Sequence, residues 1–502
     1  MKKLTLTCMA LLLAAMATAQ VGDDWDKKTK ESNGNAFDEY EKFKQQSFQQ
    51  YDDFRRQANE EYAKFMEEAW NMYSAKDAEE IQWRPKPTEP LEEEDVTVTN
   101  SEIFYEDEIN SANAILEGIA NVNTLEQPEP MQPIVPVFDA NATVMSIFLY
   151  GSAFPIRYEP EKESRFKLNN ISEKSVARFW KKLSCRYYDN IVAECLQQRK
   201  ESNLCDWAYV KLTENMAEKY FGEDTNESVV LQMYLLTQSG YQVRMARAEN
   251  KLTLLVGSKE KIYRYKYFVI KGLRFYILDK SLKNKSMNVF DRAFPKEQTL
   301  SLAMKQPKFS VTKTQKRTIA SKKYPEMTVS IELNQNLLDF YNECPLSSQW
   351  NYYSMASFSD LLKSEIYPTF REALKGKTEL EAANMLLDFV QTGFSYRTDQ
   401  EQFGYERPLY PDETFYYPYC DCEDRSILFS CLVRELLGLD VVLLNYPEHL
   451  ATAVRFNEDV KGDFLMVDGQ KYIICEPTFI SSVPVGRCAK QFKDVTPKVV
   501  KI

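Results

Sequence analysis

Three residues in the last fifth of the chain could together carry out acyl transfer through a thiol. Cys422 is followed 27 residues later by His449, the one histidine of this 502-residue sequence, and Glu476 follows after another 27 residues. A thiol attacks an amide carbonyl once an imidazole has taken its proton, and a carboxylate can orient the imidazole and stabilise its cation. The sequence therefore predicts a Cys–His–acid set.

The patterns around these residues predict the elements that hold them. Residues 426–437 have the apolar periodicity of a helix, and Asp421 is an acceptable N-cap, which places Cys422 in the first turn. Exposed backbone N–H groups at that position favour an anion, so we expect the pKa of the thiol to be lowered. His449 begins an apolar strand and Glu476 follows another. A helix followed by antiparallel strands can bring the three side chains together.

These positions also form a longer motif, which consists of Cys422, Asp424, Ser426, Leu428, His449 and Glu476-Pro477-Thr478. In this motif, residues 370–486 resemble the transglutaminase-like superfamily, a branch of the papain-type cysteine enzymes. That family usually has Asp-Pro-Thr where this chain has Glu-Pro-Thr, so the carboxylate sits one methylene further out. The resemblance implies an exported bacterial member with a papain-like α+β core and Cys422, His449 and Glu476 as its catalytic residues.

The resemblance further implies a cysteine peptidase or amide hydrolase that works through a Cys422 thioester, on a protein or peptide substrate and without cofactor or metal. Hydrolysis is favoured over cross-linking of Gln to Lys, although both reactions use the same thioester. The alternative is a non-catalytic peptide- or glycan-binding scaffold of the cell envelope.

Other interpretations of the same residues stay open. Cys420 could be the nucleophile, although the spacing to the following motif residues favours Cys422. Cys420, Cys422, His449 and Cys475 could form a zinc site of three cysteines and one histidine, although a Cys-x-Cys gap is tighter than usual. Cys422 could also be a structural relic, buried or held in a disulfide.

An internal repeat links the middle of the chain to this region. Residues 230–246 and 428–444 both read as an apolar helix, a turn glycine and a strand, at an offset of 198. Two later blocks keep an offset of 198 or 197. The equivalent positions are Asp224 for Cys422, Lys251 for His449 and Asp279 for Glu476. The middle of the chain is therefore predicted to be a degenerate second copy that lacks the thiol and the imidazole.

The N-terminal part of the chain carries a separate pattern, and the composition along the chain predicts its divisions. Residues 35–75 carry aromatic residues at eleven-residue spacing, which predicts one long helix with an aromatic stripe, either packed on its own chain or used for self-association or an envelope partner. The predicted divisions are residues 1–19 (signal peptide), 20–82 (helix), 83–136 (Pro-rich acidic linker), 137–345 (α+β middle domain) and 346–502 (transglutaminase-like domain). Deleting residues 20–95 is expected to leave Cys422 reactivity unchanged.

Charge and the first residues suggest where the protein works. Lys2 and Lys3 followed by a short apolar stretch and Ala-Thr-Ala predict a cleaved signal, a soluble mature protein and secretion to the periplasm or the cell exterior. Loss of these two lysines takes the formal charge from −11 to −13. Such a charge disfavours nucleic acid as a partner.

Overall fold

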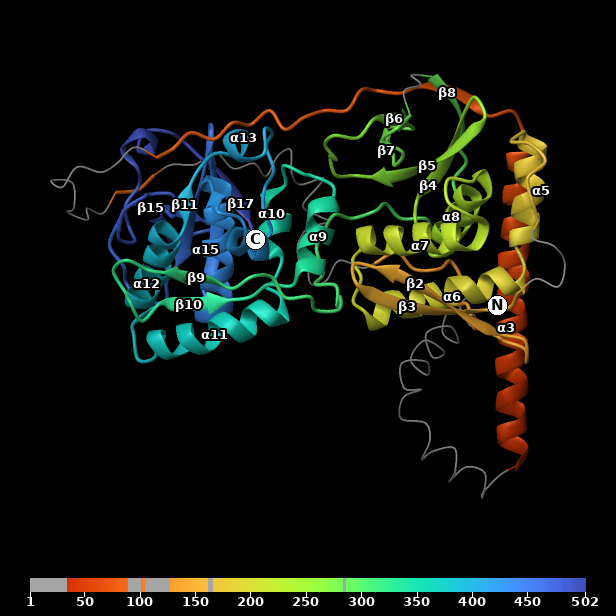
Figure 1. The fold of residues 1–502 in the computed structure, drawn as a ribbon, viewed down its shortest axis with the longest axis horizontal. Helices are drawn as coiled ribbons and strands as arrows, with labels where there is room; N and C mark the ends of the chain where they lie inside the picture. Colours follow the sequence, from red (N-terminus) through yellow and green to blue (C-terminus); the bar gives the residue numbers. More distant parts are fainter. Residues whose placement is uncertain (1–33, 89–100, 104–126, 161–165, 283–285) are drawn as a thin grey trace. The chain divides into compact units, whose positions relative to one another are not determined.

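The computed structural model describes residues 34–88, 101–103, 127–160, 166–282 and 286–502 (Figure 1). The chain divides into two compact units, Met1–Glu61 and Tyr62–Ile502, and each is described by itself. The predicted signal segment and most of the predicted linker lie outside the described residues. Within the described ranges, no helix is long and apolar enough to cross a bilayer.

Helix α3 (Gly34–Met66) begins in the first unit and ends in the second. The eleven-residue register predicted a helix as far as residue 75, and this end of the prediction is wrong. Residues 71–74 form strand β1 (Asn71–Ser74), which pairs antiparallel with β8 (Ser286–Phe290). Backbone pairing at the edge of a sheet therefore overrides the helical register after Met66.

The aromatic stripe of α3 has two environments. In the first unit, Phe43 and Phe54 are 48% and 50% exposed. In the second unit, Tyr62 is buried and its ring centroid lies 5.1 Å from that of Trp180. The last part of the stripe thus packs on the chain's own core, and an association through residues 35–75 stays a prediction.

The described part of the second unit contains two large antiparallel sheets, of six and five strands, with helices packed beside them, so the predicted α+β class is confirmed. The first sheet has the order β1-β8-β4-β5-β7-β6. Its further strands are β4 (Val243–Ala248), β5 (Lys251–Ser258), β6 (Tyr267–Ile270) and β7 (Leu273–Ile277). The helices of this part are α5 (Glu173–Leu183), α6 (Arg186–Glu201), α7 (Asp206–Phe221) and α8 (Asn226–Gln238), with a hairpin of β2 (Thr143–Leu149) and β3 (Ser152–Tyr158).

The second sheet has the order β15-β16-β14-β13-β17. Its strands are β13 (Asp440–Tyr446), β14 (His449–Arg455), β15 (Phe464–Val467), β16 (Gln470–Cys475) and β17 (Lys498–Lys501). The elements that precede it are β9 (Arg317–Ala320), β10 (Thr328–Ile331), α9 (Gln335–Glu343), α10 (Trp350–Met355), α11 (Asp360–Leu374), α12 (Glu379–Gly393), β11 (Ser395–Tyr396), α13 (Asp399–Gln402), α14 (Pro411–Tyr416), β12 (Tyr419–Cys420) and α15 (Cys422–Leu437). A short 3-10 helix, η4 (Lys490–Phe492), lies between β16 and β17.

Five strands of the first sheet follow the strand order of the second, and the pairings among four of them keep the same register. The order β8-β4-β5-β7-β6 in the first corresponds to β17-β13-β14-β16-β15 in the second. The equivalent pairs are Ala248–Lys251 and Tyr446–His449, Leu255–Ile277 and Ala453–Ile474, and Tyr267–Tyr276 and Phe464–Ile473. These pairs keep the offsets of 198 and 197 seen in the sequence, so the strand pairing agrees with the predicted repeat.

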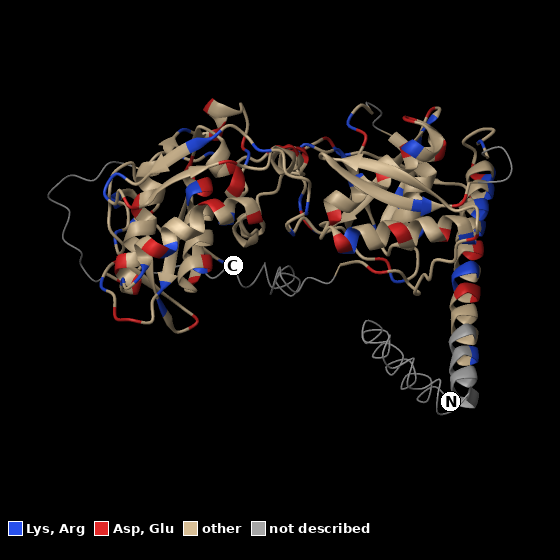
Figure 2. Cartoon of the chain, turned by 60° about the horizontal axis from the view of Figure 1, so that its bottom comes forward, with Lys and Arg blue, Asp and Glu red and all other residues tan. Residues whose placement is uncertain are grey.

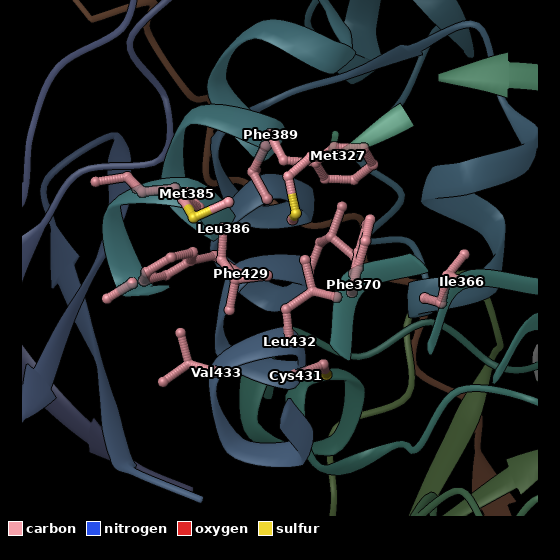
Figure 3. Close-up of a cluster of buried hydrophobic side chains, with 14 of the residues drawn as sticks. Met327, Ile366, Phe370, Met385, Leu386, Phe389, Phe429, Cys431, Leu432 and Val433 are labelled. Carbon is pink, nitrogen blue, oxygen red and sulfur yellow. The ribbon is translucent and has the colours of Figure 1, made fainter. Parts of the chain in front are cut away.

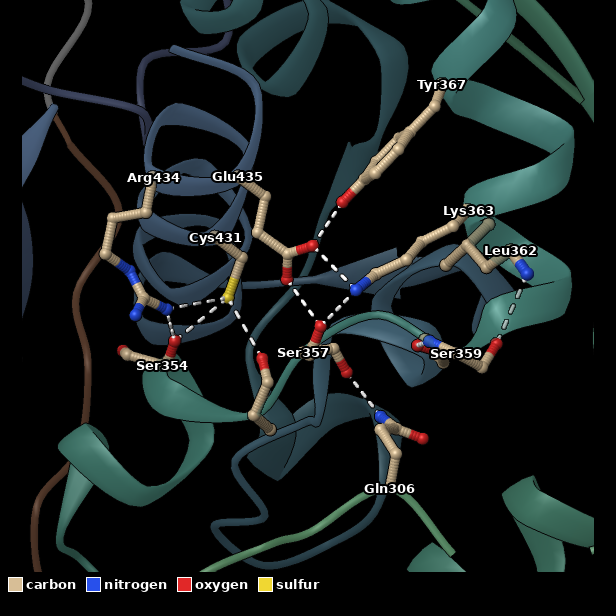
Figure 4. Close-up of polar contacts among 12 residues, drawn as sticks. Gln306, Ser354, Ser357, Ser359, Leu362, Lys363, Tyr367, Cys431, Arg434 and Glu435 are labelled. Atoms are coloured by element: carbon tan, nitrogen blue, oxygen red, sulfur yellow. Dashed lines mark hydrogen bonds and ion pairs between the residues drawn. The ribbon is translucent and has the colours of Figure 1, made fainter. Parts of the chain in front are cut away.

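Helix α15 is held in place along its apolar face. Phe429, Leu432 and Val433 belong to a buried cluster with residues of α11 and α12 (Figure 3). Near its C-terminal end, Glu435 accepts hydrogen bonds from Ser357 at 2.7 Å and pairs with Lys363 at 2.9 Å (Figure 4). Elsewhere acidic and basic residues are intermixed along the elements of the chain (Figure 2). Packing on one side and an ionic contact at one end therefore fix the direction in which the first turn of α15 points.

Asp412, in α14, should make the stability of the fold depend on pH. Its buried carboxylate accepts the Ser359 N–H at 3.1 Å, and burial raises its pKa to about 6, with the nearby Glu413 and Glu435 acting in the same direction. Because the folded pKa exceeds the unfolded one, this group stabilises the fold below about pH 4 and loses that contribution as the pH rises through 6. Asp412→Asn keeps the side chain neutral at every pH.

We therefore expect Asp412→Asn to gain about 2.4 kcal/mol in unfolding free energy relative to wild type between pH 4 and pH 7.5. Urea unfolding of both proteins at the two pH values measures this difference. A difference that is the same at both pH values would show that the fold does not raise the pKa of Asp412.

Candidate functional site

Cys422 is the first residue of α15, as the sequence predicted. Asp421 is the N-cap, and the Asp424 carboxylate accepts the Asp421 N–H at 3.3 Å. The Ser426 hydroxyl donates to the Leu450 carbonyl at 2.8 Å and so ties this end of the helix to the start of β14. Two positions of the sequence motif, Asp424 and Ser426, therefore hold the helix start in its orientation.

His449 and Glu476 are in direct contact. Nε2 of His449 lies 3.0 Å from Oε2 of Glu476, and both side chains are buried. The Thr478 hydroxyl donates to Oε1 of the same carboxylate at 2.6 Å, and the Gln391 amide donates to the Glu476 carbonyl at 2.9 Å. The imidazole ring stacks on Phe492 with 4.4 Å between centroids. Ring and carboxylate are thus fixed on both sides, as an orienting acid requires.

The thiol lies beside the start of the same strand. Two groups at this strand influence the pKa of the Cys422 thiol. The backbone N–H of Leu450, one residue after His449, lowers it, and the negative charge of Glu476 raises it. Nδ1 of His449, the ring nitrogen that does not face the carboxylate, is buried and has no hydrogen-bond partner among the described residues. That nitrogen is available to accept a thiol proton, whereas Nε2 is occupied by Glu476.

The expectation of a lowered thiol pKa is not met in this conformation. Burial raises the pKa of Cys422 well above its usual value, and the charge of Asp421 raises it further. The Leu450 N–H and Glu423 act in the opposite direction but are smaller effects. Desolvation of the thiolate therefore outweighs the favourable position at the helix start.

The competing interpretations of the cysteines have different outcomes: Cys422 is fully buried, as a structural cysteine would be, whereas Cys420 as nucleophile, a disulfide and a zinc site receive no support. The Cys420 thiol donates to the Ser395 carbonyl at 3.9 Å and belongs to the apolar core around α15. Neither Cys420 nor Cys422 takes part in a disulfide. Among the described residues, no three of Cys420, Cys422, His449 and Cys475 bring their ligand atoms within 4.8 Å of one another, so the predicted alternative of a zinc site is not formed.

Four buried carboxylates lie beside Cys422, and sequence reasoning missed them as a group. They belong to Asp399, Glu406, Asp421 and Glu423, and one oxygen of each lies within 4.8 Å of one oxygen of the others. The signal available in the sequence was the pair of acids that directly flank Cys422. Carboxylate oxygens are ligands for hard cations, so this group is the part of the described chain that could hold a metal.

The start of the predicted linker lies against the His–Glu pair. Lys86 donates its backbone N–H to the Glu448 carbonyl at 2.9 Å, directly before the histidine. The Thr88 hydroxyl contacts that of Thr478, which holds the carboxylate. Residues 83–88, named the 83–88 segment below, are therefore packed on the residues around the site. Deletion of this region is no longer expected to leave the thiol unchanged.

In the other sheet, Lys251 occupies the register position of His449. Its Nζ lies 2.8 Å from Asp279 and 3.8 Å from Asp224, so the three residues predicted to replace the Cys–His–acid set do come together. They line a cavity of about 520 Å³ that also includes Trp207 and Lys280. A lysine paired with carboxylates offers binding contacts but no thiol nucleophile.

Replacement of Glu476 should test how the imidazole is oriented. Glu476→Gln keeps the size of the side chain but removes the charge that stabilises the imidazolium, so we expect the rate of Cys422 labelling by a thiol-directed affinity probe to fall about 10²–10⁴-fold. Glu476→Asp keeps the charge and should retain part of the rate. Equal rates for wild type and Glu476→Gln, with circular dichroism unchanged, would show that another group orients His449.

Comparison with known proteins adds no family to this geometry: no protein-family model matches the chain, and no curated protein or solved structure is significantly similar to it.

Proposed function

We propose that the protein is an exported transglutaminase-like thiol enzyme, most simply a cysteine peptidase or amide hydrolase. The observation that carries the proposal is the buried contact between His449 and Glu476 beside the helix start that bears Cys422. The motif of the sequence and the helix–strand–strand order around it agree with a papain-like core. The substrate is a protein or peptide, because an amide carbonyl is what a thiol with a general base attacks.

The reaction follows from the roles that the side chains can take. Nδ1 of His449 accepts the Cys422 proton while the sulfur forms a bond to the amide carbon. Collapse of the tetrahedral species breaks the C–N bond, and the imidazolium gives its proton to the leaving amine. Water then transfers a proton to the imidazole as its oxygen attacks the thioester, and cleavage of the C–S bond returns the thiol and releases a carboxylic acid.

A peptidyl electrophile that labels thiols covalently tests the proposal without a known substrate. Wild type should be labelled at Cys422, Cys422→Ala should not be labelled there, and His449→Ala should react at least about 100-fold more slowly. Cys420→Ala is the matched control and should keep the label. Labelling of Cys422 at the same rate with and without His449 would overturn the proposal.

A non-catalytic binding function is the second candidate, and the cavity around Lys251 and Asp279 favours it. The cavity is lined by aromatic rings and by charges of both signs, a composition that suits a peptide. A peptide that raises the melting temperature of wild type and of Cys422→Ala equally, but not that of Lys251→Met, would support this function.

A further inference from the structure

The cavity of about 520 Å³ that is lined by Lys251, named the Lys251 cavity below, contains two charged side chains without a partner of opposite charge. They belong to Glu218 of α7 and to Lys280, which lies in the loop after β7. Among the described residues, neither side chain has a hydrogen-bond or ion-pair partner. Charged groups of this kind in a concave site fix the orientation of a ligand.

The other charged residues that line the cavity are compensated by groups of the chain. The distances between the paired polar atoms are 2.8 Å for Lys211 and Glu214, 2.8 Å for Lys251 and Asp279, 3.8 Å for Lys251 and Asp224, 3.6 Å for Arg264 and Glu80, 2.5 Å for Arg407 and Glu413, and 2.8 Å for Glu343 and the Tyr150 hydroxyl. One acid and one base, Glu218 and Lys280, therefore stand apart from the rest of the described lining.

Glu218 lies in an excess of negative charge. Burial raises the pKa of its carboxyl group, and the nearby carboxylates of Glu214 and Asp224 raise it further. The positive charge of Lys211 acts in the opposite direction but is a smaller effect. An ammonium group bound beside Glu218 would relieve this repulsion and form charge-assisted hydrogen bonds with the carboxylate.

Lys280 lies in an excess of positive charge. Its Nζ is 4.2 Å from the centroid of the Tyr265 ring. Partial burial lowers the pKa of this ammonium group, and the positive charges of Arg264 and Lys211 lower it further. The backbone of Arg264 has a φ of 65°, a conformation that is costly for a residue with a Cβ and that is concentrated at ligand sites. A carboxylate bound beside Lys280 would reduce the repulsion among these cations.

The remaining lining suits a ligand that also has apolar groups. The charge of Lys211 acts on both Glu218 and Lys280, so one ligand can reach both. Large rings provide much of the surface of the cavity, and their flat faces pack against apolar side chains and peptide groups. The rings belong to Trp207, Tyr263, Tyr265 and Tyr405.

The two unpaired charges exclude several classes of ligand. A neutral sugar could stack on the rings but would leave both charges without a partner. A phosphate would be attracted by Lys280 and repelled by Glu218. A molecule with an ammonium group and a carboxylate can pair with both at once, and the volume of the cavity lies in the range for ligands larger than one amino acid.

We propose that the Lys251 cavity binds a short peptide with free termini, whose ammonium group pairs with Glu218 and whose carboxylate pairs with Lys280. Lys251 has the register position of His449, so the cavity corresponds in the first sheet to the place of the thiol site in the second. The inference rests on the binding function proposed above for this cavity, because it names the ligand of that function. It holds even if Cys422 is not a nucleophile.

Isothermal titration of the full-length Cys422→Ala protein with alanyl-phenylalanyl-alanine tests the inference, since this variant has no thiol at the candidate active site to cleave the ligand. The free tripeptide should bind, whereas its C-terminal amide and its N-acetyl derivative should each bind at least about 10-fold more weakly. After Lys280→Met, the acid and the amide should bind equally. After Glu218→Gln, the free and the acetylated forms should bind equally.

Lys271→Met, in the turn between β6 and β7 and outside the cavity lining, is the matched control and should keep both differences. Circular dichroism checks that each variant is folded. Equal binding of free and capped peptides to the starting protein would overturn the inference and leave peptide binding itself intact. A difference between acid and amide that persists after Lys280→Met would also overturn it. If no form of the peptide binds at about 10 mM, the binding function proposed for the cavity is wrong as well.

Discussion

Replacement of residues 83–88 by a Gly-Ser sequence of equal length is expected to raise the rate of Cys422 alkylation by iodoacetamide at least about 10-fold. In the intact protein Cys422 and His449 are fully buried, so a reagent reaches the thiol only when the surrounding structure opens locally. The 83–88 segment contacts the backbone next to the histidine and the threonine that holds Glu476. Loss of those contacts makes opening easier, and hydration of the thiol lowers its pKa.

Peptide mapping by mass spectrometry at pH 8 measures this rate for each cysteine in the same sample. Cys185, which is half-buried and belongs to another part of the second unit, serves as the internal reference and should react at an unchanged rate. Lys86→Ala keeps the backbone N–H that reaches Glu448, so it should have little effect. A Cys422 rate as slow as in wild type after replacement of the whole segment would mean that other parts of the chain cover the thiol.

The elements around the thiol could be predicted because they are local in sequence. α15, β13, β14 and β16 follow one another with short connections, and each carries a periodicity that identifies it. The antiparallel pairing of β14 with β16 is enough to bring His449, at the start of one strand, next to Glu476, just after the end of the other. The repeat could also be predicted from the sequence, because equivalent residues of the two sheets lie 197 or 198 positions apart in the chain.

The parts that could not be predicted depend on contacts between distant residues. Thr88 contacts Thr478, which is 390 residues away in the sequence, and no local sequence pattern could predict such a contact. The end of α3 was misplaced because the chain after Met66 pairs with β8, more than 200 residues away. The thiol pKa was misjudged because the helix start is visible in the sequence, whereas the burial that outweighs it is a property of the whole fold.

The importance of Arg425 is likewise visible only in the structure. In the sequence motif it lies between Asp424 and Ser426, at a position where any residue is accepted. Its guanidinium is fully buried in α15 and donates to four backbone carbonyls. These belong to Phe394 at 2.7 Å, Phe479 at 3.2 Å, Gln391 at 3.4 Å and Thr478 at 3.5 Å. One side chain thus joins α15 to the loop after Glu476 and to the end of α12.

Arg425→Met keeps a long apolar stem but leaves these four carbonyls without their donor, so we expect the free energy of unfolding to fall by about 3–5 kcal/mol. That is a large part of the stability of an ordinary domain. Urea unfolding measures the loss, and Arg434→Met is the matched control on the same helix. Arg434 is half-buried and contacts the Ser354 carbonyl, so its replacement should cost about 1 kcal/mol. Equal losses for the two variants would show that water replaces the Arg425 guanidinium. A larger loss for Arg425→Met, accompanied by slower labelling of Cys422 by the peptidyl electrophile, which requires the aligned His449, would show that this buried cation holds the site together.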